Sequence, residues 1–210
     1  MDLVIAKLIM RLAKKRNCNM AVLTEKQIKY GFDYYHKDDA RPKSVVEVSE
    51  YDGEDKLIIN CTQLEESYSA KAKKRIWMEW CDFLVNNPDT FTELMFCTRM
   101  PQDLFDAVCV QRRLKKLHIK WGVYPDISKL EKLQELKYLH IGSGRSVSSL
   151  EPISRLVNLV ALSIENFQQI DDYAPLANLK HLESLALEGD FAAPKILKVQ
   201  SLGFLRHMKQ

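Results

Sequence analysis

The second half of the chain repeats one short pattern of apolar positions. An apolar residue is followed by two others, a second apolar residue, one further residue and a third apolar residue. The full copies are Phe91-Leu94-Phe96, Leu114-Leu117-Ile119, Leu136-Leu139-Ile141, Leu159-Leu162-Ile164 and Leu182-Leu185-Leu187. First positions of successive copies lie 22 or 23 residues apart, and Leu205 with Met208 begins a sixth copy. A fixed period of this length predicts stacked repeat units.

Each copy predicts a short strand and a helical return segment. In Leu117-His118-Ile119 every second residue is apolar, as in a strand with one buried face. More apolar residues follow each first position at offsets of 11, 14, 17 and 20. They include Val147, Leu150, Ile153 and Leu156, then Ile170, Tyr173, Leu176 and Leu179, then Ala193, Ile196, Val199 and Leu202. Steps of three residues favour a 3-10 or short helical return segment. Because one unit alone would leave its apolar face uncovered, we expect the units to stack and share a core.

These phrases resemble the leucine-rich repeat family, specifically its bacterial internalin-like repeat of 22–23 residues, over residues 91–210. The resemblance implies an α/β solenoid with a parallel sheet on the concave face and short helical or 3-10 returns. It also implies a non-enzymatic module that binds proteins. The family usually places Asn three residues after the third apolar position. Here those places hold Gly122, Gly144, Phe167 and Asp190, and Asn166 comes one residue early.

The residues before the repeats predict two further parts. Residues 1–19 contain an amphipathic basic helix over 3–16. This helix either packs on the rest of the chain with a solvated basic face, or docks on a membrane surface or partner. It is dispensable if translation begins at Met20.

Residues 20–90 predict an α/β cap for the solenoid, because an end repeat otherwise exposes half a core. Residues 20–30 favour a strand that turns at Gly31, and residues 33–43 are expected to form a polar loop. Residues 45–61 predict a β-hairpin around Asp52-Gly53, and residues 67–85 predict a helix. A further helix is expected over residues 101–113.

No cap is evident at the C-terminal end of the repeats, residues 91–210. We therefore expect either a longer natural chain or an open strand edge that another copy or a partner covers. Unpaired strand edges and unfinished cores favour association, so self-association through this edge is predicted.

Composition excludes few classes of protein. The 31 basic and 28 acidic residues leave a net charge of +3, too balanced to predict a nucleic-acid partner. Five cysteines without a Cys-x-x-Cys pair indicate reduced thiols in a cytoplasmic protein rather than a disulfide framework or zinc site. No apolar run reaches the length of a membrane span, and the N-terminus lacks the features of a signal peptide.

Residues between the apolar positions of each copy are expected to point out from the concave face. The basic and aromatic members are Lys116, His118, Lys120, Trp121, Tyr138 and His140, with Arg145 beside them. The following repeats carry Glu165 and Glu188. We predict that these residues bind a protein partner, with Trp121 and Tyr138 as anchors. Alternatively, Trp121 packs on the next turn and the charges are solvated.

His118 and His140 occupy equivalent places on neighbouring copies. They could hold a metal with Cys97 as a diagonal third ligand, or His118 could activate the Cys97 thiol. The favoured interpretation is a stacked surface pair that makes local charge pH-sensitive. We therefore predict no catalytic residue, metal or cofactor. The alternatives to protein binding are an enzyme or small-ligand binder using the cap, and a membrane-surface adaptor using the basic helix.

Overall fold

The computed structural model describes residues 23–32, 41–190 and 197–207. Its helices are α2 (Glu25–Tyr30), α3 (Ala70–Asn86), α4 (Gln102–Val108) and α5 (Glu151–Ser154). Its 3-10 turns are η2 (Val48–Glu50), η3 (Ser128–Lys132), η4 (Ala174–Asn178) and η5 (Gly203–His207). Its strands are β1 (Lys43–Val45), β2 (Lys56–Ile59), β3 (Glu93–Phe96), β4 (Met100–Pro101), β5 (Lys116–Ile119), β6 (Gly122–Val123), β7 (Tyr138–Ile141), β8 (Ala161–Glu165) and β9 (Ser184–Glu188). The basic helix predicted within residues 1–19 lies outside the described residues.

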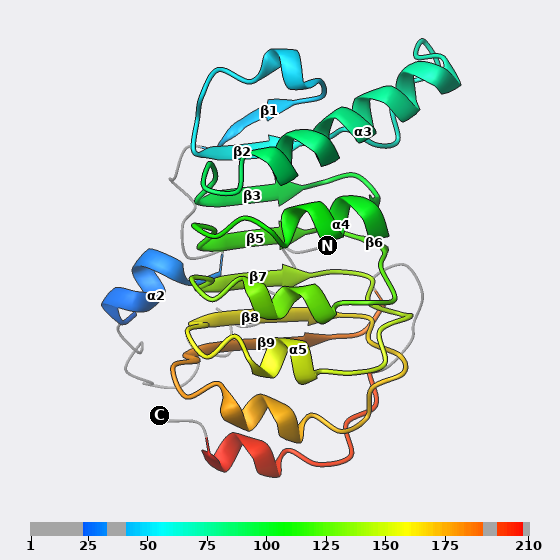
Figure 1. The fold of residues 1–210 in the computed structure, drawn as a ribbon. Coiled ribbons are helices and arrows are strands. Elements are labelled where there is room, and N and C mark those ends of the chain that lie inside the picture. Colours follow the sequence, from blue (N-terminus) through cyan, green and yellow to red (C-terminus); the bar gives the residue numbers. More distant parts are fainter. Residues whose placement is uncertain (1–22, 33–40, 191–196, 208–210) are drawn as a thin grey trace, which may run out of the picture.

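Seven strands form one parallel sheet in the order β1-β2-β3-β5-β7-β8-β9 (Figure 1). From β3 onward, residues at the same place of each copy are direct partners. Leu94 pairs with Leu117, Leu117 with Leu139, Leu139 with Leu162, and Leu162 with Leu185. The predicted architecture, a leucine-rich-repeat solenoid with a parallel sheet, is confirmed by this register. The short strands β4 and β6 form a separate parallel pair at the ends of β3 and β5.

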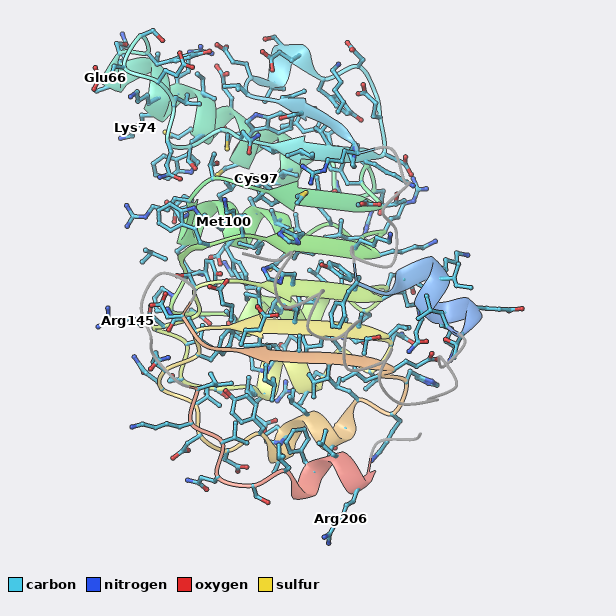
Figure 2. All side chains as sticks on the ribbon, turned by 180° about the vertical axis from the view of Figure 1, so that it is seen from behind. Glu66, Lys74, Cys97, Met100, Arg145 and Arg206 are labelled. Atoms are coloured by element: carbon cyan, nitrogen blue, oxygen red, sulfur yellow. The ribbon has the colours of Figure 1, made fainter. Side chains whose placement is uncertain are left out.

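The return segments cover one face of this sheet, while the opposite face is seen in Figure 2. Helix α4 packs on α3, and α5 lies against both η3 and η4. The helix expected over residues 101–113 is shorter, ending at Val108. The inward leucines Leu94, Leu117, Leu139 and Leu162 are fully buried. Each contributes about 1.5–3 kcal/mol by removing its side chain from water.

The N-terminal end of the sheet corrects one prediction. Strands β1 and β2 pair parallel, with Val45 opposite Ile59, so the β-hairpin predicted for residues 45–61 is wrong. Gly53 does make a turn, with a φ of 98°. Before this turn the chain passes through η2, and between β1 and η2 the carbonyl of Val46 accepts a hydrogen bond of 2.8 Å from the Trp80 indole N–H. The segment is thus a shortened strand–turn–strand unit.

Helix α3 confirms the helix predicted over residues 67–85. Ser69 begins it by accepting a hydrogen bond from the Ala72 backbone N–H, as an N-cap serine does. Ile76, Trp80 and Leu84 bury one side of it in the core. The domain boundaries at 19/20 and 90/91 stay predictions, because the sheet continues without interruption from β2 into β3.

Glycine and phenylalanine replace the expected asparagine ladder after the strands. A Cβ on Gly144 would collide with the ring of Phe167, which is fully buried in the neighbouring unit. Asn166 adopts a φ of 59°, and its side-chain amide donates to the carboxylate of Asp190 at 3.1 Å. The turns after β7 and β8 are therefore stabilised by the Phe167 ring and by the Asn166–Asp190 hydrogen bond instead.

The last return segment differs from the predicted periodicity. Leu202, expected inward, is 60% exposed, and Phe204 is buried instead and stacks on Tyr173. Leu205 lies in η5 rather than beginning a strand, and Met208 lies outside the described residues. Within the described sheet β9 is the final strand, and self-association through this edge stays a prediction.

Candidate functional site

The outward residues of the strands line up in three columns on the concave face. The first column is Glu93, Lys116, Tyr138, Ala161 and Ser184, and the second is Met95, His118, His140, Ser163 and Ala186. The third is Cys97, Lys120, Gly142, Glu165 and Glu188, and Trp121 lies just beyond Lys120. Lys116 of β5 is the register partner of Tyr138 on β7, and Glu165 of β8 is the partner of Glu188 on β9. Neighbouring strands in a sheet are about 4.8 Å apart, so each pair of partners is adjacent. The structure thus brings the predicted residues together in the predicted order.

The two histidines form a stacked pair in the second column. The rings of His118 and His140 are 4.2 Å apart at their centroids, and their planes differ by 15°. The Nδ1 atom of His140 lies 2.9 Å from the Ser163 hydroxyl, and that of His118 lies 3.4 Å from the Tyr138 hydroxyl. Burial, with a smaller contribution from Lys120, lowers the pKa of His118 to about 4. His118 is therefore neutral at pH 7, contrary to the expected pH-sensitive surface charge.

Tyr138, predicted to be an exposed anchor, is buried. Only 5% of it is exposed, and it forms a buried cluster with Phe32 and Ala161, against which Ala186 packs. The rings of Phe32 and Tyr138 meet edge to face with centroids 6.4 Å apart. This geometry is one that aromatic pairs prefer. The first column of the concave face is thus occupied by a segment from the start of the chain.

That segment begins with helix α2, where a strand was predicted for residues 20–30. Thr24 and Gln27 form a capping box: the Thr24 hydroxyl accepts from the Gln27 backbone N–H, and the Gln27 side chain accepts from the Thr24 backbone N–H. The Thr24-x-x-Gln27 spacing was the sequence signal that could have identified this helix. In Figure 1 α2 lies apart from the other helices, beside the ends of the strands at which β7 and β8 begin.

Glu183, just before β9, holds the beginning of α2. The Thr24 hydroxyl donates to its carboxylate, and the Lys26 ammonium lies 3.6 Å from the same group. The Gln27 side-chain amide donates to the Glu183 backbone carbonyl at 3.4 Å. Neither the segment nor Glu183 was among the residues predicted for the site.

The third column remains the more accessible side of the face. Lys120 and Glu188 are exposed, and Trp121 and Glu165 are partly exposed. The Trp121 backbone carbonyl accepts from the Met100 N–H at 2.9 Å, which fixes the chain where β5 ends. Arg145 is exposed on the side of the sheet labelled in Figure 2. This column carries a positive charge directly after β5 and negative charges on β8 and β9, and Gly142 after β7 lies between them.

Alternative chemistries find little support among the described residues. In this part of the chain no group of three or more His, Cys, Asp or Glu side chains could hold a metal ion. A groove of about 250 Å³ in the cap is lined by Cys61, Thr62, Gln63, Lys73, Lys74 and Trp77. Burial raises the pKa of the Cys61 thiol to about 12, which leaves it protonated and a poor nucleophile at neutral pH.

A second groove, of about 440 Å³, lies on the return side between η3 and α5. The Arg155 guanidinium donates to the Glu131 carboxylate at 2.6 Å within it. An exposed ion pair of this kind contributes little stability. No helix among the described residues has the length and apolar character needed to cross a membrane.

Comparison with known proteins gives only structural likenesses. No protein-family model and no curated protein matches the chain. An internalin, InlF, of Listeria monocytogenes is 22% identical over 60% of this chain, with a TM-score of 0.43. Internalin C2 of the same species is 18% identical over 73% of this chain, with a TM-score of 0.42. The chain spans 40% and 64% of their respective lengths. The fold assignment here rests on the strand register and burial of this chain itself.

Proposed function

We propose that the chain is a non-enzymatic module that binds a protein partner through its concave face, with an internalin-like repeat of 22–23 residues as its building unit. The observation that carries the proposal is the third column. Lys120 and Trp121 directly follow β5, while Glu165 and Glu188 end β8 and β9. Charges of opposite sign at fixed spacing favour a partner with the complementary pattern, and Trp121 offers a large contact area.

Small residues hold the outward places of β8 and β9, namely Ala161, Ser163, Ser184 and Ala186. Ala161, Ser163 and Ser184 are buried, and the Phe32 ring packs on Ala161 and Ala186. A rigid parallel sheet of this kind presents an extended surface whose backbone loses little conformational freedom on binding. The proposed contact residues are Lys116, His118, Lys120, Trp121, Tyr138, His140, Glu165 and Glu188, of which Tyr138 becomes available only when Phe32 leaves it.

We place the module in the cytoplasm, because Cys61, Cys81, Cys97 and Cys109 are all free thiols. The proposal includes no nucleic-acid partner and no cofactor. A role for residues 1–19 as a membrane-surface adaptor stays a prediction that concerns residues outside the described part of the chain.

Affinity capture from the source cell tests the proposal. The face variant Lys120→Ala/Trp121→Ala is compared with wild type and with Lys132→Ala/Glu135→Ala, a matched change of two exposed residues on the return side. We expect wild type and the control to recover the same partner. The face variant should recover at least about tenfold less of that partner. Equal recovery of all partners by the three proteins would contradict the concave face as the binding surface.

A further inference from the structure

The segment of residues 23–32 runs beside the ends where β7 and β8 begin and packs Phe32 on the concave face, but it contributes little to the main core. None of the residues of α2 is buried, and Ile28 is 57% exposed. Within the segment only Gly31 and Phe32 are buried. Phe32 belongs to a small cluster with Tyr138 and Ala161 that is separate from the main core. A helix of six residues is marginal without tertiary contacts.

The contacts at the other end of the segment are polar and partly exposed. Glu183 receives the Thr24 hydroxyl and the Lys26 ammonium, whose side chain is 54% exposed. Exposed ion pairs give orientation more than binding energy. The segment therefore has the features of a bound peptide. It has one buried aromatic anchor, a helical turn, and a first turn whose Lys26 ammonium faces the Glu183 carboxylate.

The receptor side is built from residues of separate repeats in register. Tyr138 is the strand partner of Ala161, and Ala161 is the partner of Ser184, so the anchor site spans β7, β8 and β9. Small side chains at Ala161 and Ala186 leave the space that the Phe32 ring fills. Segments held by few buried apolar contacts open more readily than the core around them.

We propose that this first column of the concave face is a receptor for a peptide segment, and that residues 23–32 are its resident intramolecular ligand. An external partner with the same chemistry, a hydroxyl or lysine facing Glu183 and an aromatic anchor about one short helix further on, displaces them. When residues 23–32 are displaced, Tyr138 becomes exposed, and the first and third columns become available to the same partner. The inference rests on the proposed function in taking the concave face as the binding surface.

The test uses the full chain and no natural partner. A fluorescein-labelled peptide with the sequence of residues 23–32 is titrated by anisotropy against wild type and against Thr24→Ala/Phe32→Ala. This double variant removes the resident anchor and capping hydroxyl but leaves the receptor residues Tyr138, Ala161 and Glu183 unchanged. A second peptide, with alanine in the place of Phe32, is the matched control.

We expect the labelled peptide to bind the double variant at least about tenfold more tightly than wild type, and the control peptide to bind neither. Equal binding to both proteins, or binding that does not depend on the phenylalanine, would overturn the proposal. So would a folded double variant, shown by circular dichroism, that binds no peptide, since residues 23–32 would then be a structural tie only. A negative result in the affinity capture above, with a positive one here, would reject the third column but not this receptor.

Discussion

His118 and His140 stack face to face across β5 and β7, with their ring centroids 4.2 Å apart. The two residues are 22 positions apart in the chain, one repeat period, and are direct strand partners. Because His118 also lies within hydrogen-bonding distance of Tyr138, its ring joins the second column to the buried first column. The pair is thus a part of the packed face.

The low pKa of His118 predicts an acid-sensitive contribution to stability. Its pKa is about 4 in the folded chain against 6.5 in the unfolded chain. Between these values the unfolded chain binds a proton that the folded chain does not. The free energy of unfolding therefore falls as pH drops from 6.5 towards 4, by about 1–3 kcal/mol, and this contribution is constant above 6.5.

Urea unfolding at several pH values measures this effect, with His118→Gln as the comparison. The variant should lose that part of the pH dependence. An NMR titration in which the His118 ring protonates near its ordinary pKa would contradict the burial that the structure shows.

A larger side chain at Gly144 is expected to disturb the packing of the neighbouring repeat. The φ of Gly144 is ordinary, but a Cβ would collide with the buried ring of Phe167. Gly144→Ala should lower the free energy of unfolding by about 1–3 kcal/mol. In a Phe167→Leu background the cost should be at least about 1 kcal/mol smaller, because the shorter side chain yields space. Additive costs in this double-mutant cycle would show that the ring is not the cause.

Gln111 ties the end of α3 to the start of the repeats. It is fully buried, and its side-chain amide donates to the carbonyls of Leu84 at 2.7 Å and Asn87 at 3.1 Å. Gln111→Met keeps the shape but leaves these carbonyls without a partner, so we expect a loss of about 2–4 kcal/mol in chemical denaturation. Gln134→Met, at an exposed position, should change stability by less than about 0.5 kcal/mol. Similar small effects for both variants would contradict the role of Gln111.

Much of the sheet could be predicted from the sequence, because a strand period of two and a repeat of constant length together determine the register. Leu117 falls beside Leu139, and His118 beside His140, for that reason alone. The connection between β1 and β2 could not be predicted. Asp52-Gly53 signals a turn but not which way the following strand pairs, and distant contacts such as Trp80 to Val46 determine the path.

The candidate site was predicted less completely than the sheet. Positions in columns follow from the repeats, yet burial within a column depends on what else covers it. Phe32 stands in no repeat, so no periodicity links it to Tyr138. The capping box at Thr24 was readable as a helix start, but its docking on Glu183 is a tertiary contact that the local pattern does not encode.

Burial predicts a clear order of cysteine reactivity. Burial raises the pKa of Cys61 to about 12 and also raises that of Cys109, while Cys97 is partly exposed. Among the four cysteines in the described residues, Cys97 should be modified first by a disulfide reagent at pH 8, and Cys61 and Cys109 only as fast as the chain unfolds. Peptide mass spectrometry of quenched samples gives the order. Early modification of Cys109 would show that the core opens at α4.

One NMR measurement tests most directly that stacked repeats carry the N-terminal segment on their concave face. In a sample with labelled alanine methyl groups, the Ala161 methyl should show nuclear Overhauser cross-peaks to the rings of both Tyr138 and Phe32. A cross-peak to Tyr138 without one to Phe32 would contradict the covered first column. The absence of both, in a folded sample, would contradict the parallel register itself.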